Sequence, residues 1–530
     1  MKKSLIAVSV AAALGGVAGS AVAQGVPPAS ERVFNRDGVG HALIVPYFNT
    51  QGGNATLLNI VNTDLVNGKA IKIRFRGASN SDDVFDFQVF LSPGDVWTAG
   101  IAKGPNGVSR LTTADKSCTV PSAIKNPLGN DFVTLRLNQR LSGEALQSET
   151  REGYVEIFNM GDIYPTDNDL FDTVKHDAGV PECDPVILDS LTYQDTQLTY
   201  PTTGLFANWT IINVPQTTTW TGDALALEAR VCAGPAQQCE PGYGELVYFP
   251  QLDLPASALV TVSNFTADPL FRKGIIPAAQ YDLPDLSTPY LPANPSSPQI
   301  NANDLSAAIA GTAWGGEFLT NPAILASTDW VVSSPTRRYY IAVDYSPTAP
   351  VLVDNFNDNS DPTAVFYRKR TATLTAGNVS LTGYQGCAIL ASQGYRDQEE
   401  TPTTPQGPVI SPGTAAAAPS LCGEVSTVSF NGIAVPSGSV TASANTTPES
   451  TTLKSKVART NVALPFTDGW GFVTQPNNNI NGRSYGLPLV VNQFARAVNP
   501  GATPGVSGTY AATWPGRVLG RGDEPPLPSP

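Results

Sequence analysis

Histidine, a frequent general base and metal ligand, occurs twice in the sequence, at His41 and His176. His176 follows Asp167, Asp169 and Asp172, and imidazole and carboxylate groups together are residue types that bind divalent metal ions. The same stretch has the composition of an ordinary polar turn, which is the interpretation we favour. His41 directly precedes an apolar run, so we expect it in the core or at a strand edge.

A second group of metal-ligating side chains lies in segment 354–361, which reads Asp-Asn-Phe-Asn-Asp-Asn-Ser-Asp. Calcium takes about six to eight oxygen ligands, and a loop rich in Asp and Asn presents them densely. The glycine and glutamate that an EF-hand loop needs are missing. The sequence therefore predicts either a polar turn without an ion, which we favour, or a calcium site at Asp354, Asn357, Asp358 and Asp361. Neither interpretation requires a cofactor.

Signatures of the common enzyme classes are missing from the sequence, which contains no GxSxG, no HExxH and no phosphate-binding glycine loop after a strand. A glycoside hydrolase needs two carboxylates at a suitable separation, and the chain has 45 acidic residues. Exposed tryptophans at Trp209, Trp220 or Trp314 would stack on sugar rings, although tryptophan more often lies in a core. We expect no catalytic site, and the alternative is a polysaccharide-binding protein or a carboxylate-dependent hydrolase.

The N-terminal residues have the order of a secretory signal peptide. Lys2 and Lys3 precede an apolar run over residues 5–17, and small residues at 21–23 precede Gln24. We expect cleavage after residue 23 and export to the cell surface or the extracellular space. The apolar run is shorter than the ~20 residues that cross a bilayer, so we expect no transmembrane segment.

The composition describes an acidic chain. Lysine and arginine number 32 against 45 aspartates and glutamates, which gives a net charge of −13, and loss of the signal peptide makes it more negative. Nucleic-acid binding needs clusters of basic residues on one surface, and the sequence contains no basic tail or basic helix. We therefore expect no nucleic-acid partner.

Six cysteines in a chain that we expect to be exported favour disulfide bonds. Two of them enclose a short Gly-Pro turn, and two others flank a stretch rich in Pro, Thr and Ala. Zinc binding is disfavoured because no CxxC pair occurs. The pairs that spacing favours are Cys232–Cys239 and Cys387–Cys422, which leaves Cys118 with Cys183.

Alternation of apolar and polar residues predicts antiparallel strands near the N-terminus. Residues 70–76 and 85–91 both alternate, with a polar turn between them. One face of the first strand carries a basic stripe, formed by Lys72, Arg74 and Arg76. We expect water to solvate this basic stripe, as on most half-buried strands, and a ligand-binding patch is the alternative.

The fold class that these patterns predict is mainly β, with antiparallel β-sandwich domains of Ig-like type, long Pro- and Gly-rich loops and little helix. The chain contains 47 Gly and 45 Pro, and its 530 residues are too many for a single core. The expected organisation is a signal peptide (1–23), an N-terminal β-sandwich (24–115), a second β-rich region (116–267), a Pro-rich linker (268–300), a C-terminal β-rich domain (301–515) with a flexible excursion (401–420), and a disordered tail (516–530).

Five strings of strand and turn residues are spread over most of the mature chain, at 58–63, 89–97, 151–156, 328–332 and 395–400. The first reads Leu-Asn-Ile-Val-Asn-Thr and the second Val-Phe-Leu-Ser-Pro-Gly-Asp-Val-Trp. The chain resembles, in these strings, a group of bacterial exported proteins described as cell-surface proteins. The resemblance implies export and a β-rich architecture, and it transfers no functional residue.

Together these observations predict an exported structural protein of the cell surface or extracellular space, such as a subunit of a self-assembling surface layer or matrix. Its expected partners are further copies of itself or other cell-surface components. Open sheet edges and flat faces would favour assembly. Paired carboxylates and aromatic residues in a cleft would favour the alternative, an enzyme or binding protein for polysaccharide.

Overall fold

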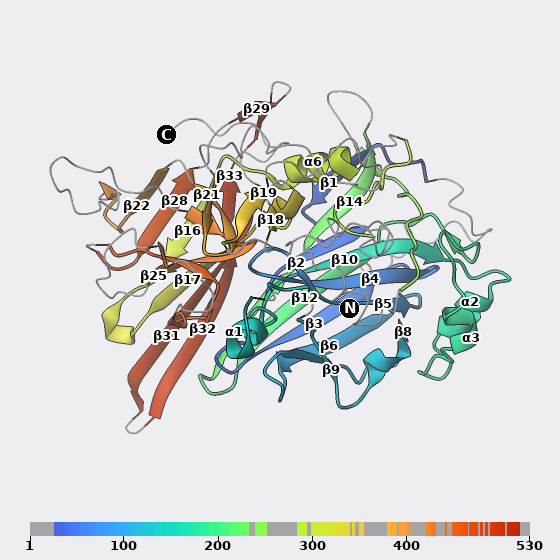
Figure 1. The fold of residues 1–530 in the computed structure, drawn as a ribbon, viewed down its shortest axis with the longest axis horizontal. Coiled ribbons are helices and arrows are strands. Elements are labelled where there is room, and N and C mark those ends of the chain that lie inside the picture. The colour runs from blue at the N-terminus through green and yellow to red at the C-terminus, as the bar shows by residue number, and fades with distance from the viewer. Residues whose placement is uncertain are drawn as a thin grey trace, which may run out of the picture.

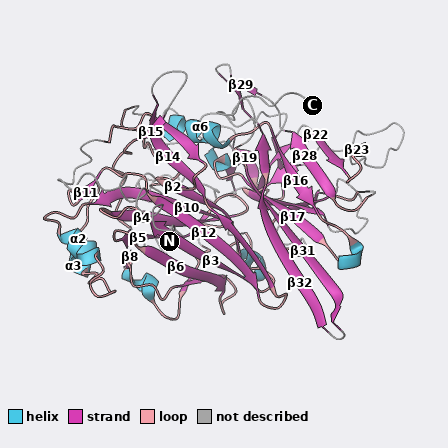
Figure 2. Ribbon diagram, turned by 180° about the vertical axis from the view of Figure 1, so that it is seen from behind, coloured by secondary structure: helices cyan, strands magenta, loops and turns pink. Residues whose placement is uncertain are grey.

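The structure is a computed structural model that describes most of the chain in segments. These are residues 26–134, 136–138, 140–232, 239–251, 284–293, 298–339, 342–344, 349–353, 379–389, 392–400, 402–403, 420–430, 440–441, 448–464, 466–474, 478–480, 483–485, 488–503 and 506–519. Within the described residues, strands account for 49 % and helices for 10 %, so the fold is mainly β, as the sequence predicts. Figure 2 shows this dominance of strands, with the short helices at the periphery.

The first part of the chain forms two antiparallel sheets that face each other as a sandwich, on the right in Figure 1. The larger sheet has the order β1 (Glu31–Asn35), β14 (Leu225–Cys232), β2 (Ala42–Asn49), β10 (Glu152–Ile163), β4 (Gly68–Gly77), β5 (Asp83–Leu91), β8 (Cys118–Val120), with β11 (Leu198–Thr199) on β10 and β15 (Cys239–Pro241) on β14. The smaller sheet has the order β13 (Thr218–Asp223), β12 (Leu205–Asn213), β3 (Asn54–Asn62), β6 (Val96–Lys103), β7 (Ser109–Thr112), β9 (Asn130–Asp131).

Short helical segments decorate this sandwich. They are η1 (Ser122–Lys125), α1 (Gly143–Ser148), α2 (Asp169–Val174) and α3 (Pro185–Leu188). Alternation decides which side chains enter the core, because successive side chains of a strand point to opposite faces. Along β12 the burial alternates residue by residue, and the inward positions include Trp209 and Ile211.

The strands of the expected regions 24–115 and 116–267 interleave. The strand β10 lies between β2 and β4, and β12 pairs with β3 along its whole length. Residues on both sides of the expected boundary at 115 therefore share two sheets and form one sandwich. A domain boundary expected from the sequence separates consecutive segments of the chain. Antiparallel pairing joins strands that lie far apart along the chain, so it can cross such a boundary.

The second part contains two larger sheets and three small ones, on the left in Figure 1. The larger sheets have the orders β23 (Pro402–Thr403), β22 (Ser392–Arg396), β28 (Gly469–Thr474), β16 (Ala313–Phe318), β33 (Arg517–Leu519) and β26 (Val440–Thr441), β27 (Ala458–Asn461), β25 (Val425–Phe430), β17 (Ser327–Ser333), β31 (Val490–Thr503), β32 (Val506–Pro515). The small sheets are β18 (Ala342–Asp344) with β19 (Val351–Val353), β20 (Val379–Thr382) with β21 (Gln385–Ile389) and β24 (Ser420–Cys422), and β29 (Asn478–Ile480) with β30 (Arg483–Tyr485).

Helical segments of the second part are α6 (Pro298–Ile309), η3 (Pro322–Ile324) and η4 (Arg337–Tyr339). None of the helices in the described segments is long and apolar enough to cross a membrane. The expectation of a disordered tail at 516–530 is wrong for its first residues, because β33 pairs with β16 in the sheet. The excursion 401–420 lies mostly outside the described residues.

The linker expected at 268–300 is described at 284–293, where it is part of the core, and at 298–300, where it begins the helix α6. Leu286 and Tyr290 are buried, and the Tyr290 hydroxyl donates a hydrogen bond to the carbonyl of Asn159 on β10 at 2.7 Å. Asn301 on α6 donates two hydrogen bonds to carbonyl groups of this segment. This segment and α6 therefore hold the first part of the chain to the second.

A continuous core joins the two parts. Phe494 on β31 packs against Tyr47, Trp209 and Trp220 of the first part, with ring centroids 6.0, 5.7 and 6.5 Å away. The indole Nε1 of Trp220 also donates a hydrogen bond to the carbonyl of Ala495 at 3.1 Å. Because these contacts are apolar and buried, the two parts pack as one body.

Candidate functional site

The calcium ligands expected from the sequence, Asp354, Asn357, Asp358 and Asp361, lie outside the described residues, and this site stays a prediction. Across the segments that the structure describes, no group of three or more His, Cys, Asp and Glu side chains is arranged to hold a metal ion. His176 contacts Ser92, whose Oγ lies 3.0 Å from its Nδ1, and Asp95 at 3.6 Å.

All six cysteines are paired, and the pairs are those that the spacing favours. Cys232 and Cys239 are directly opposite each other on β14 and β15, and so are Cys387 and Cys422 on β21 and β24. An even set of disulfides fits an oxidising, extracellular environment. The three bonds are Cys118–Cys183, Cys232–Cys239 and Cys387–Cys422.

The tryptophans considered for sugar stacking are all buried, so the interpretation that the sequence favours, a position in the core, is confirmed for them, and the alternative of an exposed aromatic platform is not. Trp209, Trp220 and Trp314 have exposed fractions of 0 %, 1 % and 0 %. Trp314 packs edge-on against Trp330 in the second part. Their position on the inward face of a strand explains the burial, since that face meets the opposite layer.

His41 is a buried structural histidine. Its Nδ1 accepts a hydrogen bond from the backbone N–H of Ala229, so the proton of the neutral ring is on Nε2, which donates to the carbonyl of Gly242 at 3.1 Å. Burial, assisted by the positive charge of Lys69, lowers the pKa of His41 to about 3. The ring is therefore neutral at physiological pH and fills the core position that the sequence predicts.

The basic stripe of β4 is buried, which contradicts the expectation that water solvates it. Lys72, Arg74 and Arg76 are between 0 and 3 % exposed. The outer face of the larger sheet is covered by segment 284–293, and Arg74 donates a hydrogen bond to the carbonyl of Pro284 at 2.8 Å. The sequence predicts a half-buried strand, but segment 284–293 packs on the polar face of β4 and buries it.

Acidic side chains neutralise this basic stripe. The Nε of Arg74 lies 3.2 Å from Oδ2 of Asp83, and Lys72 forms an ion pair with Asp86. Burial together with the nearby charge of Asp86 raises the pKa of Asp83 to about 6, whereas the charges of Lys72 and Arg74 outweigh burial and lower that of Asp86. The basic stripe is thus a buried network in which acidic side chains balance the positive charges. It does not form the exposed ligand-binding patch that was the alternative.

A polar seam runs between the two parts of the chain and is centred on Glu152. This carboxylate accepts hydrogen bonds from the Tyr47 hydroxyl, from the Ser455 hydroxyl at 2.7 Å and from the Lys456 N–H at 2.7 Å. Burial, opposed by these hydrogen bonds, raises the pKa of Glu152 to about 7. Because Tyr47 belongs to the first part and Ser455 to the second, one side chain ties the parts together.

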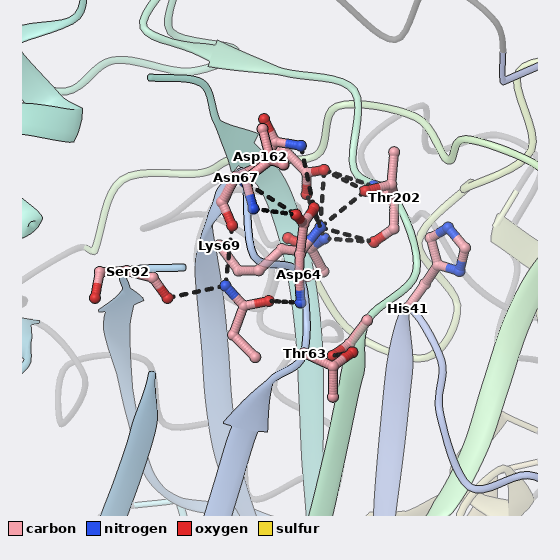
Figure 3. A network of polar contacts seen from close by, with 12 residues as sticks. His41, Thr63, Asp64, Asn67, Lys69, Ser92, Asp162 and Thr202 are labelled. Carbon is pink, nitrogen blue, oxygen red and sulfur yellow. Dashed lines mark hydrogen bonds and ion pairs between the residues drawn. The ribbon is translucent and has the colours of Figure 1, made fainter. Parts of the chain in front are cut away.

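A separate network surrounds Lys69 at the start of β4, where Figure 3 shows Asp64, Asp162 and Thr202 gathered around its ammonium group. The Nζ atom is 2.8 Å from both carboxylate oxygens of Asp162, 3.2 Å from Oδ2 of Asp64 and 2.8 Å from Oγ1 of Thr202. Lys69 lies on the same face of β4 as Ile71, so this network is set into the core. Spacing along the sequence gave no sign of it, because its members meet through strand register.

One groove opens at the edge of the smaller sheet, with a volume of about 580 Å³. Its lining contains one carboxylate, Asp115, with Lys116 and Lys125, and no aromatic side chain. A pair of carboxylates flanked by aromatic residues, the arrangement expected of a polysaccharide hydrolase, is not found in this groove.

A ribbon formed by β31 and β32 extends beyond the body at the lower left of Figure 1. Pairing of β31 with β17 ends at Arg496, whereas its pairing with β32 continues to Thr503. The strand β32 is last in the order of its sheet, so within the described residues one of its edges has no hydrogen-bonded strand partner, although β13 of the first part packs against β32. A charge-free, Thr- and Ala-rich alternation at 497–515 was the sequence signal for this ribbon.

Comparison with known proteins finds no relative on which a function could be based. No family model matches the chain, and neither a curated protein nor a solved structure matches it. The resemblance to bacterial cell-surface proteins therefore stays a prediction from the strings quoted above.

Proposed function

We propose that this chain is an exported structural protein of the cell surface or extracellular matrix, and that it assembles with further copies of itself. The single observation that carries the proposal is the β31–β32 ribbon. Isolated two-stranded ribbons are marginally stable in water and gain stability when another strand is added. The edge of β32 that has no hydrogen-bonded strand partner in the described residues offers backbone N–H and C=O groups for such an addition.

The occupant that fits this edge is the ribbon of a second copy. The two strands of the ribbon comprise 14 and 10 residues, and Arg496 is their one charged residue. The whole chain has a net charge of −13, so copies repel each other least where this ribbon meets its equivalent. Two identical edge strands pair antiparallel across a two-fold axis, which makes the contact self-complementary.

The three disulfides support the extracellular setting, because such bonds persist where thiols are not kept reduced. The alternative, a polysaccharide-binding protein or hydrolase, receives no support from the three tryptophans considered for it, which are buried, or from the groove, which lacks paired carboxylates.

A lysine on the ribbon tests the proposal, since a charge on an edge strand opposes strand addition. Tyr510 is 62 % exposed on β32, and Tyr510→Lys should shift the mature protein from oligomer to monomer in light scattering at matched concentrations. Val186→Lys, at a position 76 % exposed on α3, is the control with the same added charge and should leave the oligomer unchanged. A wild-type protein that is monomeric at every concentration would reject self-assembly.

A further inference from the structure

The pair Lys69 and Asp162 combines a nucleophile and an electrophile in full isolation from water. The two residues are directly opposite each other on β4 and β10, and both side chains are 0 % exposed. We propose that they react with each other to form an amide bond between Nζ of Lys69 and the side-chain carbonyl carbon of Asp162, which cross-links the two strands. This inference does not depend on the proposed function.

Proximity supplies the first part of the argument. The Nζ atom lies 2.8 Å from each carboxylate oxygen of Asp162, so it contacts the group whose carbon it would attack. Hydrogen bonds between β4 and β10 on both sides of the pair hold this arrangement. A reaction between groups held in contact avoids the entropy loss of a bimolecular encounter, which corresponds to an effective concentration of roughly 10⁵ M or more.

Hydrogen-bond donors polarise the carboxyl group of Asp162. Its Oδ2 accepts from the backbone N–H of Thr202 at 3.1 Å and from the Thr202 hydroxyl, and its Oδ1 accepts from Nδ2 of Asn159 at 2.8 Å. Donors placed in this way stabilise the negative charge that develops on oxygen when a nucleophile adds to the carbon. Burial, opposed by the charge of Lys69, raises the pKa of Asp162, which favours the protonated acid that amide formation needs.

A second carboxylate is placed to move protons. Oδ2 of Asp64 lies 3.2 Å from Nζ of Lys69. Burial acts to raise the pKa of Asp64, but the charge of Lys69 and the backbone N–H groups of Asn67 and Val66 outweigh it and lower the pKa. The two carboxyl groups that contact Lys69 are thus shifted in opposite directions, one toward the acid and one toward the ionised base.

The reaction balances without any co-reactant. The ammonium of Lys69 gives one proton to the carboxylate of Asp162, which leaves a neutral amine and a neutral acid. The amine lone pair forms the C–N bond, and the C=O electron pair moves to Oδ2, where Thr202 donates. Asp64 takes a proton from the nitrogen and delivers it to the Oδ1 hydroxyl. The C–Oδ1 bond then breaks, one water leaves, the C=O bond re-forms and Asp64 is again a carboxylate.

The chain contains an internal comparison in Lys72, another buried lysine of β4. In the described residues its Nζ contacts Asp86 and the amide oxygen of Gln251. Among the residues that the structure describes, no second carboxylate contacts this nitrogen to take its proton, and we expect Lys72 to stay a free amine.

Mass spectrometry of the purified mature protein decides the proposal. The intact chain should be lighter by one water molecule than the mass calculated for its sequence with three disulfides. After reduction and trypsin digestion, the peptides that contain Lys69 and Asp162 should leave as one branched species, because trypsin does not cleave after an amidated lysine. A full intact mass with both peptides recovered separately would overturn the proposal and identify the pair as an ordinary buried ion pair.

Two variants separate the roles. Lys69→Arg keeps a positive charge but has no amine nucleophile, so it should show the full mass. Asp64→Asn keeps Oδ1, which accepts from the N–H groups of Val66 and Asn67, and should retain the fold while most of the chains remain uncross-linked. Asp115→Asn, a change in a comparable turn at Ser117, is the matched control and should cross-link fully. Cross-linking of Asp64→Asn at the wild-type rate would overturn the role of Asp64 as the base.

Discussion

The hydroxyl of Tyr47 on β2 donates a 2.5 Å hydrogen bond to Oε1 of Glu152, the first residue of β10. The same carboxylate accepts hydrogen bonds from Ser455 and Lys456, which belong to the second part of the chain. Nearby, the carbonyl of Leu453 accepts hydrogen bonds from Asn49 and Asn54. The segment around Leu453 therefore packs against the first part through hydrogen bonds. The protonation state of Glu152 should affect the stability of the contact between the two parts.

Stability should fall as the pH rises above the ordinary range of a glutamate. Burial raises the pKa of Glu152 to about 7, so the folded state binds a proton that the unfolded chain releases near pH ~4.3, and the free energy of unfolding decreases between these values. The group should account for a loss of about 3 kcal/mol between pH 5 and pH 8, at ~1.4 kcal/mol for each unit of pKa. Urea unfolding at the two pH values measures it.

The matched pair Glu152→Gln and Glu240→Gln provides the control for this pH dependence. The first removes the buried titration and should flatten the decline, and the second changes an exposed residue on β15 and should not. Glu424, whose pKa burial raises to about 7 against the opposing charge of Arg337, should keep part of the decline in both variants. An identical slope in wild type and Glu152→Gln would contradict the assignment.

Loss of Arg74 should destabilise the protein strongly. Arg74→Met leaves Asp83 without its closest ion-pair partner and the carbonyl of Pro284 without its donor, in a site with 0 % exposure. Breaking a buried ion pair from one side costs about 3–5 kcal/mol. Arg110→Met is the control, since it removes an arginine that pairs with Asp131 at the surface, and it should change the thermal midpoint little. Equal effects of the two substitutions would show that burial of the basic stripe adds nothing.

The disulfides should differ in what they contribute. Cys118–Cys183 closes a loop with a sequence separation of 65, and Cys232–Cys239 one with a separation of 7. Restriction of the unfolded chain grows with loop length, so paired Cys→Ala substitutions should cost about 4 kcal/mol for the first bond and about 2 kcal/mol for the second. Denaturant unfolding of the two double variants tests this order, and a larger loss at Cys232–Cys239 would reverse it.

Calcium should promote assembly if the segment that contains Asp354, Asn357, Asp358 and Asp361 binds it. A divalent ion would offset the repulsion between chains that each carry a net charge of −13. Light scattering of the mature protein should show larger particles in millimolar calcium and their dispersal by a chelator. Simultaneous replacement of Asp354, Asp358 and Asp361 by alanine should weaken the response. A particle size of the wild-type protein that does not change with calcium would exclude the site.

The sequence by itself determined the mainly β architecture and two of the disulfide pairs, because both depend on the local pattern, and the third pair, Cys118–Cys183, followed by elimination. Alternation within 70–76 and 85–91 places β4 and β5, and short spacing selects Cys232–Cys239. His41 was likewise placed correctly in the core, since the apolar run that follows it marks a buried strand.

Tertiary structure alone decided which faces are covered and which distant residues meet. Alternation shows that Lys72 and Arg74 share a face of β4, but only the packing of segment 284–293 against that face makes it a buried one. Lys69 and Asp162 are 93 positions apart, and it is the register of β4 against β10 that brings their charged groups into contact. Pairing between distant strands depends on the whole arrangement of sheets, so no local pattern encodes it.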